Sequence, residues 1–80
     1  MDEGKPLPHG LFREVCELIW GPSWVGAGAR EMEINERTVK RWKAEEFNIP
    51  GGMREKLVKA CRSHAVQLTK MADKLERLSL

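Results

Sequence analysis

Cysteine is scarce in this 80-residue chain, and Cys16 and Cys61 are too few for a disulfide framework. So low a cysteine content is typical of a reducing compartment. Both residues fall among apolar positions with helical spacing. We therefore expect both thiols to lie in the core.

Long apolar runs are also lacking, because none approaches the roughly 18 residues that span a bilayer. The first ten residues are polar and partly acidic, which is unlike a secretory signal peptide. Hydrophobic residues make up 41% and charged residues 32% of the chain, as in soluble globular domains. We expect a cytoplasmic protein without a membrane partner.

Catalytic signatures are missing too: there is no glycine-rich phosphate loop, nucleophile elbow or catalytic carboxylate pair. His9, Cys16, Cys61 and His64 are four residues of types that bind zinc. Because the cysteines fall in apolar stripes and His9 in an irregular lead-in, we expect no metal site. The sequence predicts a protein that is not an enzyme and has no cofactor or small-molecule substrate.

Apolar residues with helical periodicity predict an all-α fold. Four helices are expected over residues 11–20, 24–32, 36–46 and 53–78. Ser23 and Asn35 are suited to cap the second and third helices. Gly26 and Gly28 weaken the second helix but allow another element to approach closely.

Positive charge is concentrated in the second part of the chain. Residues 1–36 carry three basic side chains against seven acidic ones, whereas residues 37–80 carry eleven against five. Such asymmetry favours a polyanionic partner for the second part. A solvated basic helix face would produce the same balance, so charge alone does not decide.

The predicted third helix has two chemically distinct faces. Val39 and Trp42 share one face and are expected to point inward. The opposite face carries Arg37, Lys40, Arg41 and Ala44, flanked by Lys43. Arginine and asparagine can bind guanine and adenine through paired hydrogen bonds, whereas lysine is better suited to phosphate. We expect Asn35, Arg37 and Arg41 to contact bases, and Lys40 and Lys43 to contact phosphate.

The stretch WGPSWVGAGAREMEINERTVKRWKAE resembles the helix-turn-helix of lambda-repressor-like (Xre/Cro-type) regulators. More narrowly, it is similar to small bacterial and phage proteins that combine YGP-W, ERTVRRW and IP-G motifs. The resemblance covers residues 11–62 and includes Ile49-Pro50-Gly51-Gly52. It implies that the third helix enters the major groove and that the start of the second helix touches phosphate.

That resemblance adds Ser23 and Trp24 as phosphate contacts through backbone N–H groups. Arg54 and Lys56 are further phosphate candidates, although a plain solvated face is an equally good interpretation of each. Val25 replaces a glutamine that the family often has, so a base contact from the second helix is not expected. Glu33 replaces a glycine of the family's turn, which predicts an altered turn, because glutamate tolerates a positive φ poorly.

The last predicted helix carries a heptad pattern of apolar residues. Its members are Leu57, Cys61, His64, Leu68, Met71, Leu75 and Leu78. We expect its first half to pack on the first and third helices, and its second half to pair with another subunit. The dimer interface would comprise His64, Leu68, Met71, Leu75 and Leu78. The alternative is a long helix folded over its own domain, and the orientation of the subunits is left open.

The sequence thus predicts a four-helix helix-turn-helix protein with a long C-terminal helix that dimerises. It comprises a flexible arm over residues 1–10, a DNA-binding domain over 11–62 and a dimerisation part over 63–80. The expected function is that of a sequence-specific regulator of transcription, a repressor that binds an inverted repeat in double-stranded DNA as a homodimer. Two alternatives remain: an oligomeric adaptor or inhibitor that binds protein and not DNA, and an accessory protein of DNA packaging or recombination.

Overall fold

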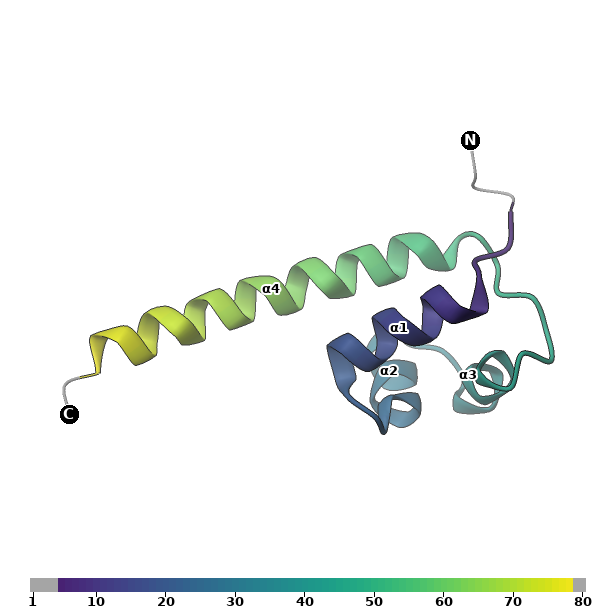
Figure 1. Ribbon diagram of the computed structural model, residues 1–80, viewed down its shortest axis with the longest axis horizontal. Coiled ribbons are helices and arrows are strands. Elements are labelled where there is room, and N and C mark those ends of the chain that lie inside the picture. Colours follow the sequence, from purple (N-terminus) through teal and green to yellow (C-terminus); the bar gives the residue numbers. More distant parts are fainter. Residues whose placement is uncertain (1–4, 79–80) are drawn as a thin grey trace.

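A computed structural model describes residues 5–78, which form an all-α fold of four helices. The helices are α1 (His9–Trp20), α2 (Trp24–Met32), α3 (Glu36–Lys43) and α4 (Met53–Arg77). The first three are packed together at one end of α4, whose far end extends beyond them (Figure 1). The all-α prediction and the number of helices are therefore confirmed for the described residues.

Two helix boundaries differ from those predicted. α1 begins at His9 rather than residue 11, because the carbonyl of Pro8 accepts the first helical hydrogen bond from the Phe12 N–H at 3.0 Å. α3 ends at Lys43 rather than residue 46, because Glu45 takes a left-handed conformation with φ 60°. The predicted range of α2 is confirmed, and α4 ends one residue early at Arg77.

The lead-in to α1 is attached to the domain, so a flexible arm over residues 1–10 is wrong for its described part. Leu7 forms an isolated antiparallel bridge with Ile49, whose carbonyl accepts its N–H at 2.9 Å. His9 Nε2 lies 2.7 Å from the carbonyl oxygen of Phe47. These contacts hold the start of α1 against the segment between α3 and α4. Residues 1–4 of the predicted arm lie outside the described residues.

The core is centred on three aromatic rings from three helices. The Phe12 ring makes edge-to-face contacts with Trp24 at 5.5 Å and with Trp42 at 5.7 Å between centroids. Val39 and Ile49 are fully buried beside them. Edge-to-face pairs contribute about 0.5–1.5 kcal/mol beyond their buried area. The inward face predicted for α3, formed by Val39 and Trp42, is confirmed by its burial.

The helical glycines of α2 differ in what surrounds them. A Cβ atom built on Gly28 would lie 3.1 Å from two ring atoms of Trp20, so the absence of a side chain lets this indole pack on the helix. A Cβ on Gly26 would make only an ordinary contact with Glu36 at 3.6 Å. The close approach that the sequence suggested therefore occurs at Gly28.

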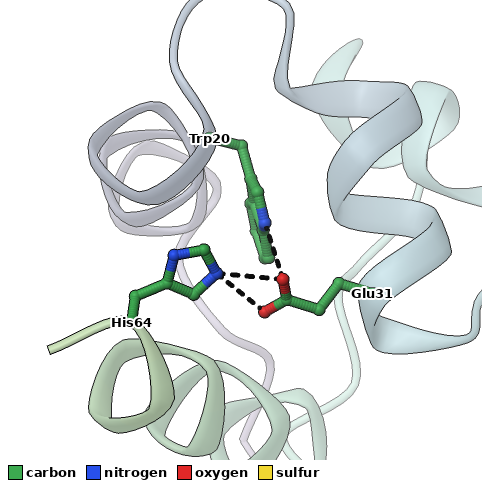
Figure 2. A network of polar contacts seen from close by, with 3 residues as sticks. All are labelled: Trp20, Glu31 and His64. Atoms are coloured by element: carbon green, nitrogen blue, oxygen red, sulfur yellow. Dashed lines mark hydrogen bonds and ion pairs between the residues drawn. The ribbon is translucent and has the colours of Figure 1, made fainter. Parts of the chain in front are cut away.

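Trp20, Glu31 and His64 connect α1, α2 and α4 (Figure 2). The Glu31 carboxylate accepts from the Trp20 indole N–H at 3.3 Å and lies 2.9 Å from His64 Nε2. The His64 ring also stands edge-on to the Trp20 ring. His64 is thus engaged within its own chain, and its place in a dimer interface stays a prediction.

The first half of α4 packs on α1 and α2, not on the first and third helices as predicted. Leu57 and Ala60 are buried in this contact, and Lys56 Nζ donates to the carbonyl of Met32 at the end of α2. All described residues from 65 onward are exposed. The second half of α4 therefore has no cover within residues 5–78.

The two cysteines differ in environment, so the prediction that both lie in the core is wrong for one of them. Cys16 is fully buried on α1, whereas Cys61 is exposed on α4. Burial, together with the nearby Cys61 and Glu17, raises the pKa of the Cys16 thiol to about 12. Cys61 lines the groove between α1 and α4, where it is open to solvent.

Thiol labelling checks this assignment. At pH 8 we expect one thiol per folded chain to react with a disulfide reagent within minutes, because only Cys61 is accessible to it. The Cys16 thiol is expected to react only after denaturation. Rapid reaction of the folded Cys61→Ser variant would contradict the burial of Cys16.

Candidate nucleic-acid interface

The turn between α2 and α3 keeps a regular conformation although it lacks glycine. Glu33 adopts the left-handed region with φ 58° and ψ 47°, and the Ile34 N–H donates to the Ala29 carbonyl at 2.8 Å. The Glu33 N–H donates to Arg30, which completes a Schellman motif. The expected alteration of the turn is therefore wrong. Glutamate adopts the conformation at a cost of about 1 kcal/mol.

Asn35 caps α3 as predicted. Its Oδ1 accepts the backbone N–H of Arg37 at 2.8 Å, and its backbone is extended. The cap orients the side-chain amide and uses one lone pair of Oδ1, so Asn35 has a structural role whether or not it contacts a base. Glu36 follows in the first turn, where a carboxylate is stabilised by the positive end of the helix dipole.

The outward face of α3 is cationic. We call it the basic face; its members are Arg37, Lys40, Arg41 and Lys43, all of them exposed. Within residues 5–78, no carboxylate forms an ion pair with any of the four. Val39 and Trp42 anchor the opposite side of the helix in the core. The face predicted from the sequence is therefore present and accessible.

Two cations of the basic face lie over aromatic rings. The Arg41 guanidinium carbon is 5.5 Å from the centroid of Phe47, and Lys43 Nζ is 5.6 Å from that of Trp24. Cation–π contacts at exposed sites contribute about 0.5–1 kcal/mol and leave the cation available to other ligands. Lys43 thereby lies next to the start of α2, which brings two of the predicted phosphate-contacting elements together.

The end of α3 is held by residues that the sequence pattern did not single out. Glu45 occupies the left-handed position of a second Schellman motif, in which the Glu46 N–H donates to Arg41 at 3.0 Å. Arg13 of α1 donates to the Lys43 carbonyl at 3.0 Å and lies 3.7 Å from the Glu45 carboxylate. Arg13 shares no helical spacing with these partners, so periodicity gave no signal for it.

The start of α2 corresponds only in part to the prediction. Ser23 is the residue before the helix, but its hydroxyl makes no capping hydrogen bond. It is exposed and remains a candidate phosphate contact. Trp24 is only 1% exposed, so its predicted contact with phosphate is wrong: the residue is enclosed by the core.

The predicted phosphate contacts on α4 are not joined to the basic face. Lys56 Nζ donates to the Met32 carbonyl at 3.1 Å and so fastens α4 to α2, while its contact with phosphate stays a prediction. Arg54 is exposed and lines a groove between α1 and α4 with Leu7 and Leu11. α4 packs on α1 and α2 and makes no contact with α3.

The remaining predicted interface residues of α4 are exposed, which is what a partner surface requires. Leu68, Met71, Leu75 and Leu78 are between 54% and 70% exposed. Four large apolar side chains on one helix are a substantial exposed surface for so small a protein.

No family model matches the chain, and neither the curated proteins nor the solved structures include a match to it. The described helices include none with the length and apolarity to cross a bilayer. Residues 5–78 also hold no group of three histidine, cysteine or acidic side chains placed to bind a metal ion.

Asn35 offers a direct check on how α3 is positioned. We expect Asn35→Ala to lower the free energy of unfolding by about 1 kcal/mol, because the Arg37 N–H loses its acceptor. Asn35→Asp retains an acceptor oxygen at the same place and should stay close to the original stability. Urea denaturation followed by circular dichroism measures both. Equal losses in the two variants would contradict a capping role.

Proposed function

We propose that this protein is a sequence-specific regulator of transcription that binds double-stranded DNA, and that it represses by occupying its operator. The observation that carries the proposal is the basic face: three exposed cations, Arg37, Lys40 and Arg41, lie on the side of α3 opposite its buried side, and the exposed Lys43 flanks them. A helix presented in this manner fits the major groove of B-DNA.

The roles of individual residues follow from their chemistry and position. Arg37 and Arg41 would read guanine through its O6 and N7 atoms, and the Asn35 amide would meet an adjacent base. Lys40, Lys43 and the backbone at Ser23 would bind phosphates on either side of the groove. The stacking of Arg41 on Phe47 limits the rotamers of this guanidinium before DNA arrives.

The exposed end of α4 supports a homodimer as part of the same proposal. Covering Leu68 and Leu75 contributes about 1.5–3 kcal/mol for each side chain, which adds to the small amount that one core of this size supplies. A twofold dimer presents two basic faces to an inverted repeat, whose half-sites lie about 34 Å apart for each helical turn. Occupancy of the operator is the simplest mode of repression, because it needs only the DNA-binding surface.

The DNA-binding proposal is tested by Arg37→Ala combined with Arg41→Ala. We expect the double variant to keep its helical content and to lose at least 100-fold in affinity for sites selected from random DNA, because each paired contact contributes about 1–3 kcal/mol. The matched control is Lys70→Ala with Lys74→Ala, which removes the same charge from the far part of α4. Fluorescence anisotropy measures the affinities.

Salt dependence separates phosphate binding from other modes of association. Affinity should fall steeply between 50 and 200 mM salt if several cations contact phosphates.

An Arg37→Ala, Arg41→Ala variant that binds selected DNA as well as the original chain would refute the proposal and favour the adaptor. Selected sites that share no inverted repeat would argue instead for a role in packaging or recombination.

The homodimer is tested by Leu68→Lys combined with Leu75→Lys. We expect monomers in sedimentation velocity at micromolar concentration, since two leucines that the dimer would bury are replaced by charged residues. Val66→Lys is the matched control, because Val66 is also exposed on α4 but lies away from the line joining the two leucines. A monomeric parent chain, or a double variant that remains dimeric, would contradict the homodimer.

A further inference from the structure

The apolar surface that α4 exposes is not the one that the heptad pattern alone predicts. Leu57 is buried in the core and His64 binds Glu31 of its own chain, so both are occupied. A neighbouring set of exposed residues repeats with the same alternation of three and four. We call it the exposed seam: Val58, Cys61, Ala65, Leu68, Ala72 and Leu75.

The first half of the exposed seam forms one wall of an apolar groove. Val58 and Cys61 lie on the α4 side, and Leu11 and Val15 of α1 form the opposite wall. The groove has a volume of about 240 Å³. Arg54 and Arg62 stand at its rim, so an occupant should be apolar with an acidic flank.

The second half of the exposed seam has the properties that such an occupant needs. It lies on the part of α4 that extends past the end of α1 (Figure 1). Leu68 and Leu75 project from it and are 70% and 63% exposed. Glu76 is the charged residue nearest the seam in this part of α4, whereas Lys70, Asp73, Lys74 and Arg77 fall on other sides of the helix. This end of α4 is thus complementary to the groove in both apolarity and charge.

We propose that two copies of this chain pair through antiparallel α4 helices, so that the exposed end of each helix lies in the α1–α4 groove of the other. The inference rests on the homodimer of the proposed function and specifies the orientation of its subunits. A parallel pair would oppose Arg54 with Arg54 and Arg62 with Arg62 at the two groove rims. It would also leave Leu11 and Val15 without an apolar partner from the far end of α4.

One antiparallel register brings all six positions of the exposed seam into layers. Val58 lies opposite the partner's Leu75, Cys61 opposite the partner's Ala72, and Ala65 opposite the partner's Leu68. The longest side chains then face smaller ones, which lets the helices approach closely. The partner's Glu76 is one residue from the layer of Val58, and Arg54 is one helical turn from that layer, so the carboxylate is within reach of Arg54 and offsets its charge.

This register also fixes the separation of the two DNA-reading ends. At a rise of about 1.5 Å per residue, the two Met53 positions lie about 40 Å apart along the paired helices. Half-sites on successive turns of B-DNA are about 34 Å apart. The antiparallel dimer therefore separates the starts of its two α4 helices, around which the two domains are built, on the scale of an inverted repeat.

Disulfide cross-linking distinguishes the two orientations, because Cys61 is an exposed thiol within the seam. Each chain carries Cys16→Ala, which removes the buried thiol near Cys61, and sedimentation velocity first establishes that each is a dimer. The chains are then oxidised mildly and run on denaturing gels without reductant. We expect no covalent dimer from the chain with Cys61 alone, and a covalent dimer once Ala72→Cys is added.

A third chain combines Ala72→Cys with Cys61→Ser and should again give no covalent dimer, because the antiparallel link joins position 61 to position 72. Covalent dimers of the first or the third chain would show a parallel pair and overturn the proposal. A dimeric second chain that does not cross-link would overturn this register. If sedimentation shows only monomers, the homodimer of the proposed function fails, while DNA binding by a single basic face is still open to measurement.

A test of the groove needs no cysteine. Leu11→Lys should raise the dimer dissociation constant about tenfold or more, because the partner's helix loses apolar contact with α1. Glu17→Lys places a lysine on the same helix outside the groove and should leave dimerisation unchanged. An unchanged dissociation constant for a folded Leu11→Lys variant would show that α1 does not contact the partner.

Discussion

Phe12 joins the first three helices of the molecule. Its ring lies edge-to-face with Trp24 of α2 and Trp42 of α3, so a single side chain of α1 sets the position of both helices. Because Trp42 anchors the inward side of α3 in the core, the opposite side of the helix faces solvent. The accessibility of Arg37 and Lys40 is therefore a consequence of aromatic packing on the other side of the same helix.

The sequence predicts α3 well where the periodicity of apolar residues determines which side of the helix is buried. Val39 and Trp42 are three residues apart, Asn35 precedes a run of helix formers, and both signals correspond to the structure. Periodicity fails where contacts cross between elements. The spacing of Arg13 and Lys43 in the sequence does not predict that the Arg13 side chain donates to the Lys43 carbonyl at the end of α3. The engagement of His64 by Glu31 is a tertiary contact of the same kind, which the heptad pattern did not predict.

The expectation that a left-handed turn position needs glycine is also too strict. The turn after α2 and the end of α3 each require a left-handed residue, and glutamate occupies both positions. In each case the Schellman hydrogen bonds and the packing of neighbouring apolar residues determine the backbone conformation. Residue preference is a weak guide when several contacts impose the same geometry, and the sequence could not show how many contacts would do so.

α4 packs on α1 and α2 and leaves α3 alone, which separates two properties that evolve under different demands. If the protein binds DNA as the proposed dimer, changes that lengthen, shorten or rotate the far end of α4 would alter the spacing of half-sites and leave the basic face undisturbed. Substitutions on the basic face would alter the preferred sequence and leave subunit association unchanged. Spacing and base preference could then change independently.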